Sequence, residues 1–192
     1  MDTGAEVLSA ARLGDKSSFA SIELIPFEKN ISENSVIKAL QQSNSDLFYN
    51  VAIADQKLKQ EAKEFAESES MSAFSVIHPN AIIDPTAKVG EGAFVGPLSV
   101  ISTNAEIGKH SIIHIHSSIG HHAQLGDYCA ILPGARISGH ARIGHGVLVG
   151  SNAFVFQGVS IGDFAKVDAL TYVKENLPSH RIASSRSPRR LH

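Results

Sequence analysis

Residues 75–176 read SVIHPN AIIDPT AKVGEG AFVGPL SVISTN AEIGKH SIIHIH SSIGHH AQLGDY CAILPG ARISGH ARIGHG VLVGSN AFVFQG VSIGDF AKVDAL TYVKEN when they are divided into blocks of six. The third residue of all seventeen blocks is Ile, Val or Leu, from Ile77 in the first block to Val173 in the last. The first residue of each block is Ser, Ala, Cys, Thr or Val. A repeat of this regularity is stronger evidence for the fold than local helix or strand propensities, because each unit can bury its apolar side only against the next unit.

A period of six does not suit an amphipathic helix, whose apolar residues lie three and four positions apart. It suits very short strands joined by tight turns, with one aliphatic side chain per block pointing inward. Three blocks then close a triangular coil of eighteen residues, so residues n and n+18 stack about 4.8 Å apart, the spacing of paired strands. The seventeen blocks predict about 5–6 coils. The pattern resembles the hexapeptide repeat of the left-handed parallel β-helix, and the left hand is implied by that resemblance.

The composition is that of an ordinary soluble protein, with 192 residues, 43% of them hydrophobic, and a formal net charge of −2. No apolar run approaches the eighteen or so residues that a membrane span needs, so we expect no membrane partner. The single cysteine, Cys129, excludes an internal disulfide and favours a cytoplasmic location. Cys129 also holds a small-residue position of the repeat, which predicts a packing role rather than a nucleophile.

Residues 1–74 do not follow the six-residue repeat, and helix and strand patterns alternate along them. A strand is predicted at 47–54, and Asp55 stands as the N-cap of a helix whose Leu58, Ala62 and Phe65 share one face. The alternation predicts a small parallel α/β domain, a reduced Rossmann-like unit without an opening strand and glycine-rich turn. The expected division is therefore an α/β domain at 1–74, a β-helix at 75–176 and a basic tail at 177–192.

This arrangement resembles the sialic acid O-acetyltransferase and bacillosamine N-acetyltransferase family of sugar acyltransferases, most strongly from Phe48 to Asn176. The resemblance implies acetyl-CoA as the acyl donor, a sugar or sugar-nucleotide acceptor, and a homotrimer with sites between subunits. The family's AIG-D/N turn is matched in part by residues 52–56, AIADQ, which makes Asp55 and Gln56 candidate acceptor-binding residues. The chain departs from the family at residues 26–28, PFE, where a pair of aspartates is usual.

The resemblance also names a catalytic base. The family's catalytic histidine lies seven residues before the aromatic residue of an I-G-D-F-type turn, which here is LGDY at 125–128, so the matching residue is His121. Eighteen residues further on is Gly139, where the family places a backbone amide close to the thioester carbonyl. An imidazole is a suitable base near neutral pH, and a backbone N–H can stabilise the oxyanion of a tetrahedral intermediate.

Other histidines crowd the same stretch. His122 and His140 are eighteen residues apart and are expected to stack and to contact the acceptor. The family usually has an acidic residue at the position of His122. His110, His114 and His145 are expected to be surface residues of turns.

The acyl donor is expected at the late coils and the tail, with Gly150 and Ala169 on the coils and Arg181, Arg186 and Arg189 beyond them. Arginine suits the phosphates of coenzyme A because its planar fork pairs bidentately with phosphate. We expect no nucleic-acid partner, because the net charge is slightly negative and no aromatic residues interleave the arginines.

Two other functions remain open. His116 and His121 form an H-x4-H pair that resembles one in the γ-class carbonic anhydrases, whose zinc takes three imidazoles across a subunit boundary. That reading needs a further histidine upstream, and none lies between Pro79 and Lys109, so no metal is expected. The third possibility is a solenoid that serves as a scaffold or binding module, since Leu170 stands where the family carries a glycine near the cofactor.

Overall fold

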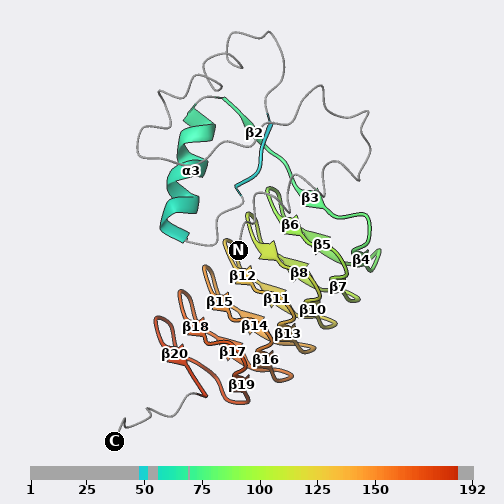
Figure 1. Cartoon of the computed structure of the whole chain (residues 1–192), viewed down its shortest axis with the longest axis vertical. Helices are drawn as coiled ribbons and strands as arrows, with labels where there is room; N and C mark the ends of the chain where they lie inside the picture. The colour runs from blue at the N-terminus through green and yellow to red at the C-terminus, as the bar shows by residue number, and fades with distance from the viewer. Residues whose placement is uncertain (1–47, 52–55, 69, 186–192) are drawn as a thin grey trace, which may run out of the picture.

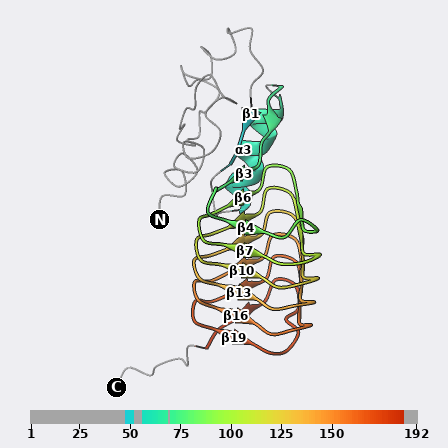
Figure 2. The ribbon, with the colours of Figure 1, turned by 90° about the vertical axis from the view of Figure 1, so that its right-hand side faces the viewer.

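The chain forms a stack of triangular coils preceded by a small βαβ unit (Figures 1 and 2). The computed structural model describes residues 48–51, 56–68 and 70–185, with the side chains of 56–58 left out. Each coil contributes one two-residue strand to each of three parallel sheets. Within these residues no helix has the length and apolar character to span a membrane.

The seven-stranded sheet contains β3 (Val76–Ile77), β6 (Phe94–Val95), β9 (Ile112–Ile113), β12 (Ala130–Ile131), β15 (Leu148–Val149), β18 (Lys166–Val167) and β20 (Ile182–Ala183). The six-stranded sheet contains β4 (Ile82–Ile83), β7 (Val100–Ile101), β10 (Ser118–Ile119), β13 (Arg136–Ile137), β16 (Phe154–Val155) and β19 (Tyr172–Val173). The five-stranded sheet contains β5 (Lys88–Val89), β8 (Glu106–Ile107), β11 (Gln124–Leu125), β14 (Arg142–Ile143) and β17 (Ser160–Ile161).

The predicted register is confirmed. Strand residues pair with those eighteen positions away, as Ile113 does with Ile131 and Ile119 with Ile137. The exceptions are at the C-terminal end, where Ile161 lies opposite Leu177 and Lys166 lies opposite Ile182, each sixteen residues on. The parallel sheet therefore continues to β20, past the predicted end of the β-helix at residue 176.

Three columns of turns join the sheets, and we name them by their place in the coil. The first corner leads from the seven-stranded to the six-stranded sheet and includes residues 97–98, 115–116, 133–134, 151–152 and 169–170. The second corner leads to the five-stranded sheet and includes residues 103–104, 121–122, 139–140 and 157–158. The third corner returns to the seven-stranded sheet and includes residues 109–110, 127–128, 145–146 and 163–164.

The core consists of the third-position aliphatic residues of the repeat, with the small first-position residues packed between them. Ile113, Ile131 and Val149 have no exposed surface, and neither have Ala105 and Ala135. Ile77 is an exception to the predicted pattern, because 44% of its surface is exposed. It lies on β3, an end strand of its sheet, so no earlier coil stacks on it.

The sixth residue of the repeat takes a left-handed backbone conformation in most turns. The non-glycine residues include Asn104, His110, His116, His122 and His140, with φ between 53° and 57°. Asn and His are enriched in this conformation. Several histidines of the solenoid therefore have a conformational reason for their positions as well as any chemical one.

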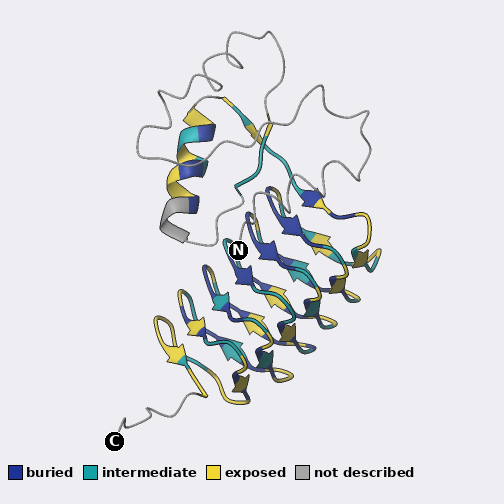
Figure 3. Ribbon diagram, viewed as in Figure 1, coloured by how far each residue is buried: buried dark blue, intermediate teal, exposed yellow. Residues whose placement is uncertain are grey.

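The βαβ unit consists of β1 (Phe48–Tyr49), α3 (Gln56–Ser68) and β2 (Ser72–Ala73), with β1 and β2 parallel. The predicted helix after Asp55 is confirmed. Phe74 continues this unit onto the solenoid, where it packs against buried Phe94 and Ile112 of the seven-stranded sheet. Both residues of β6 and of β9 are buried, and these strands are dark blue in Figure 3. The other elements expected in 1–47 lie outside the described residues, so a Rossmann-like domain stays a prediction.

Helix α3 is anchored to the third corner by a buried lysine. Lys59 has no exposed surface, and its Nζ donates a hydrogen bond to the carbonyl oxygen of His110 at 3.0 Å. The His110 ring stacks between Tyr49 and Tyr128, with centroid distances of 6.0 and 5.4 Å. The prediction that His110 is a surface residue is therefore wrong.

The prediction that His114 is a surface residue is also wrong, since only 2% of its surface is exposed. Its Nδ1 accepts a hydrogen bond from the backbone N–H of Ile115 at 3.1 Å. His145 is exposed, as predicted.

Burial lowers the pKa of Lys59 from 10.5 to about 8. Between these values the unfolded chain binds more protons than the folded one, so Lys59 makes stability rise with pH, by at most about 1.4 kcal/mol per pH unit. Methionine at this position cannot titrate. We expect the free energy of unfolding of wild type minus that of Lys59→Met to increase from pH 8 to pH 10 in urea denaturation. Tyr49 and Cys129 are common to both proteins, so a difference that stays constant with pH would contradict the burial of a titrating amine.

Candidate active site at the second corner

The second corner brings His121 against Gly139. The two residues lie in successive coils, and the N–H of His140 donates to the carbonyl oxygen of His121 at 2.9 Å. A Cβ atom added to Gly139 would lie 2.5 Å from Nε2 of His121 and 2.7 Å from its Cε1. The imidazole therefore lies across the space that a side chain at 139 would fill. The predicted proximity of these two residues is confirmed.

Gly139 is unusual among the residues at its position. It is the only glycine at the fifth position of the seventeen blocks. Its φ is not in the left-handed region, unlike that of Gly134 or Gly158 at the sixth position. Backbone conformation therefore does not require glycine here, but a side chain at 139 would displace the His121 ring. This single departure from the repeat is visible in the sequence and marks the position.

The backbone N–H of Gly139, at the fifth position of its block, is available to donate a hydrogen bond to a ligand. At the third corner the fifth-position N–H is paired by a side chain from the next coil. The N–H of Lys109 donates to Asp127 Oδ1 at 2.7 Å, and the N–H of His145 donates to Asp163 Oδ1 at 2.8 Å. Within the described residues, the N–H of Gly139 has no such partner. The fifth-position N–H groups of Thr103, His121 and Gln157 at the second corner likewise have no partner among the described residues, so the group at Gly139 is distinguished by the His121 ring beside it, which makes it the candidate to bind a ligand oxygen.

His121 is also in contact with two further histidines. Its Nδ1 lies 3.3 Å from Nδ1 of His122, and its ring centroid lies 4.9 Å from that of His140. His122 and His140 stack with a centroid distance of 5.0 Å and an interplanar angle of 15°, as their eighteen-residue spacing predicted. On the other side, Nε2 of His122 lies 3.2 Å from Nδ2 of Asn104. The side chains of all three histidines are exposed, so solvent and small ligands can reach them.

The candidate cofactor residues lie elsewhere. Gly150 and Ala169 adjoin at the first corner, where a Cβ on Gly150 would lie 2.4 Å from the Ala169 nitrogen. The six-stranded sheet separates them from His121 within one chain. Arg181 is exposed beside β20.

Three of the predicted site residues cannot be placed. Asp55, Arg186 and Arg189 lie outside the described residues. Gln56 is the first residue of α3, and its side chain is not described.

The H-x4-H pair does not form a chelating group within one chain. His116 is in the first corner and His121 is in the second, with β10 between them. The histidines that lie close enough to share an ion are His121, His122 and His140, and His116 is not among them.

Cys129 is a packing residue, as predicted. It has no exposed surface, and its Sγ donates to the carbonyl oxygen of Gly144 at 3.1 Å. Burial raises the pKa of the Cys129 thiol from 9.0 to about 12, so the nucleophilic thiolate does not form near neutral pH.

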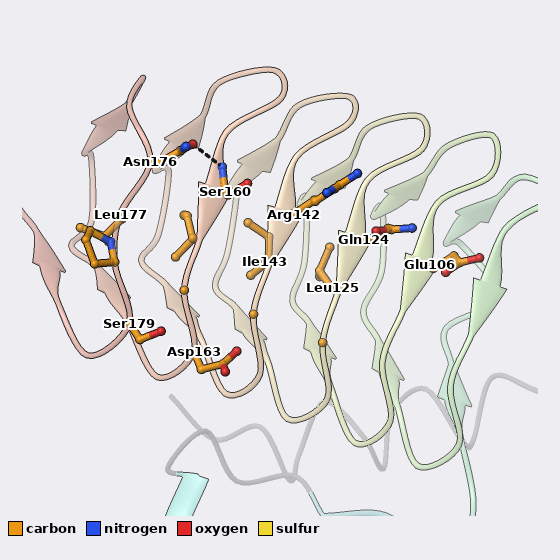
Figure 4. Close-up of a pocket in the computed structure, with 15 residues that line it drawn as sticks. Glu106, Gln124, Leu125, Arg142, Ile143, Ser160, Asp163, Asn176, Leu177 and Ser179 are labelled. Atoms are coloured by element: carbon orange, nitrogen blue, oxygen red, sulfur yellow. Dashed lines mark hydrogen bonds between the residues drawn. The ribbon is translucent and has the colours of Figure 1, made fainter.

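An open groove runs along the outer face of the five-stranded sheet (Figure 4). Its floor carries Glu106, Gln124, Arg142 and Ser160 from successive strands. At its end Asn176 Oδ1 accepts a hydrogen bond from the N–H of Ser160 at 2.8 Å. Neither His121 nor Gly139 lines the groove, so it is distinct from the second corner.

Two protein-family models match the solenoid. Residues 104–139 match the bacterial transferase hexapeptide (six repeats), and residues 140–174 match the hexapeptide repeat of succinyl-transferase. No curated protein matches the sequence.

Solved structures match over most of the chain. A perosamine N-acetyltransferase from Caulobacter crescentus, a histidine-to-asparagine variant in complex with CoA and GDP-perosamine, has a TM-score of 0.82 at 24% identity, over 95% of this chain and 89% of that chain. The acetyltransferase domain of PglB from Neisseria gonorrhoeae has a TM-score of 0.78 at 22% identity, over 92% and 89%. WeeI from Acinetobacter baumannii has a TM-score of 0.72 at 23% identity, over 76% and 71%. The chain is therefore a left-handed parallel β-helix protein built from hexapeptide repeats, as the sequence predicted.

Proposed function

We propose that the protein transfers an acetyl group from acetyl-CoA to an amino or hydroxyl group of a sugar or nucleotide-linked sugar, in the cytoplasm. The observation that carries this proposal is the contact between His121 and Gly139, which sets a base beside an unpaired backbone N–H. Further support comes from the similar structures, whose names include a sugar N-acetyltransferase with CoA and GDP-perosamine bound. An amino sugar is accordingly the first acceptor to test.

In the proposed reaction, the acceptor nitrogen attacks the thioester carbonyl carbon while Nε2 of His121 takes a proton from it. The carbonyl oxygen becomes an oxyanion, which the N–H of Gly139 stabilises. The C–S bond then breaks, and the departing thiolate receives the proton from His121. The products are the N-acetyl sugar and free CoA, and the histidine returns to its neutral form.

This role requires a particular tautomer of His121. Nε2 can accept a proton only if the ring hydrogen is on Nδ1, which then donates to Nδ1 of His122, 3.3 Å away. The hydrogen of His122 is then on Nε2 and points to the side-chain amide of Asn104 at 3.2 Å. With its oxygen turned toward this nitrogen, Asn104 accepts the bond. We infer that His122 and Asn104 together replace the acidic residue that the family usually has at position 122.

We further propose a homotrimer in which the second corner of one protomer faces the first corner of the next. This arrangement would bring His121 near Gly150 and Ala169 of a neighbour, which a single chain keeps on opposite edges of the six-stranded sheet. His140, and Asp55 and Gln56 of the N-terminal unit, are proposed acceptor contacts. The tail arginines Arg181, Arg186 and Arg189 are proposed contacts for the CoA phosphates.

The distribution of exposed apolar side chains supports this packing. The six-stranded sheet and its two adjoining corners carry a set of exposed large hydrophobic residues, namely Ile82, Leu98, Val100, Phe156, Leu170 and Tyr172. Such a concentration is typical of a protein interface. A closed ring of three copies would cover it.

Replacing His121 should remove the base and leave the fold unchanged. We expect His121→Ala to lower kcat by about 10²–10⁴-fold in acetyl transfer from acetyl-CoA to a panel of nucleotide-linked amino sugars. His145→Ala is the matched control, since His145 is an exposed histidine at the fifth position of another corner. Equal activity of the two variants would exclude His121 as the base, and no transfer by the wild type to any acceptor would overturn the proposed function.

Two glycine variants should separate catalysis from stability. In Gly139→Ala the new methyl group meets the tip of the His121 side chain, which can move aside. We expect a loss of at least about 100-fold in kcat, with an unfolding temperature lowered by no more than about 4 °C. In Gly120→Ala the methyl group would lie 2.5 Å from the Gly139 nitrogen, so the backbone must shift and stability should fall as well. Full activity of Gly139→Ala would show that the position of the ring is unimportant.

The proposed trimer is tested by light scattering. The wild type should have three times the 20.5 kDa mass of the chain. Ile82→Glu should dissociate the trimer by placing a charge in the interface. Ile182→Glu should not, although both isoleucines are 65% exposed, because Ile182 lies on the seven-stranded sheet. A monomeric wild type at micromolar concentration would contradict a site between subunits.

A further inference from the structure

The second corner holds three imidazoles close enough to share one ion. The nitrogen atoms that His121, His122 and His140 can offer all lie within 4.8 Å of one another. Two of these residues are adjacent in one turn and the third comes from the next coil. No carboxylate or thiol is part of the group.

The spacing of the first two nitrogens matches that of metal ligands. Zinc binds histidine at about 2.0–2.1 Å in tetrahedral geometry, which separates two ligand nitrogens by about 3.3–3.4 Å. The Nδ1 atoms of His121 and His122 are 3.3 Å apart. The distance between these two nitrogens is therefore already that of two ligands of one ion.

The third ligand is held by the solenoid itself. The His140 ring lies 4.9 Å from the His121 ring and 5.0 Å from the His122 ring, and its backbone N–H is bonded to the carbonyl oxygen of His121. To complete the set, His140 has to bring a ring nitrogen from within 4.8 Å of the other two to the spacing of metal ligands. The paired backbones thus reduce the ordering cost of binding.

We propose that His121, His122 and His140 bind one divalent ion of the later first-row transition metals, such as Zn²⁺, with the fourth position open to solvent. Three neutral imidazoles favour Zn²⁺, Cu²⁺, Ni²⁺ or Co²⁺ over Mg²⁺ and Ca²⁺, which prefer oxygen ligands. This site differs from the H-x4-H pair considered in the sequence and departs from the expectation that no metal binds.

The ion has a consequence for catalysis, and this part rests on the proposed function. An ion on Nδ1 of His121 leaves the ring hydrogen on Nε2, so Nε2 has no lone pair with which to accept a proton. Metal binding therefore blocks the base. The protein would transfer acetyl groups only when the ion is absent, which makes free Zn²⁺ a reversible inhibitor.

Binding is measured with Co²⁺, whose visible absorption reports tetrahedral coordination, on full-length protein freed of metal by a chelator. We expect saturation at one ion per chain. His140→Asn should weaken binding by at least about 100-fold, since even an outer-shell change costs about 10–100-fold. His116→Asn is the matched control: His116 is exposed, has a φ of 56° against 57° for His140, and lies at another corner. It should bind as the wild type does.

Two results would overturn the site itself. One is the lack of any saturable Co²⁺ absorption in the wild type. The other is equal affinity in His140→Asn and the wild type. Neither result depends on acetyl transfer, so the failure of this site and the failure of the proposed function are distinguishable.

The expected inhibition by Zn²⁺ is tested by measuring the acetylated sugar by chromatography. Release of the CoA thiol is not used as the signal, because that thiol would itself bind Zn²⁺. Inhibition should be half-maximal at the Zn²⁺ concentration that half-saturates the site, and a chelator should reverse it. His116→Asn should be inhibited like the wild type. Saturation with Zn²⁺ without loss of activity would overturn inhibition and the assignment of His121 as the base.

Discussion

The structure depends on the exact repetition of backbone hydrogen bonds from one coil to the next. Each strand is only two residues long and would not be stable alone. Pairing at intervals of eighteen residues places every inner strand between two neighbours and stacks the turns of successive coils on one another. The coils approach so closely at the fourth position that a methyl group on Gly108 would lie 2.3 Å from the backbone of Gly126. Side chains at a corner are therefore forced into columns, and the chemistry of a corner is set by which residues occupy one column.

This constraint explains how much of the molecule could be predicted from the sequence. The period gave the three sheets, the inward aliphatic residues, the stacking of His122 on His140 and the contact of His121 with Gly139. Each of these depends only on counting along one repeating path. The predictions that His110 and His114 are surface residues failed, because the burial of a side chain at a turn is not fixed by the period alone. His110 is covered by α3 and Tyr49, which lie outside the repeat and whose docking has no period to count.

The burial of Lys59 is a second feature that the sequence does not predict. Its sequence context, in a helix rich in lysine and glutamate, is typical of an exposed residue. The structure buries it because the carbonyl oxygen of His110 is within reach of the amine. A buried amine is costly unless it is hydrogen-bonded, and this one has a single carbonyl acceptor among the described residues. Only the packing of the βαβ unit on the third corner decides that outcome, and the linear pattern of the helix carries no sign of it.

The choice between an enzyme and a passive scaffold depends on the difference between the fifth and sixth positions of the repeat. A histidine at the sixth position is favoured by the left-handed backbone, so His116 requires no functional explanation. Neither His121 nor Gly139 is in that conformation. A scaffold would have no reason to keep a glycine at the fifth-position site against which the His121 ring of the preceding coil lies. The proposed acyl transfer requires a base and an oxyanion donor separated by the thickness of one coil, and this pair of residues offers that arrangement.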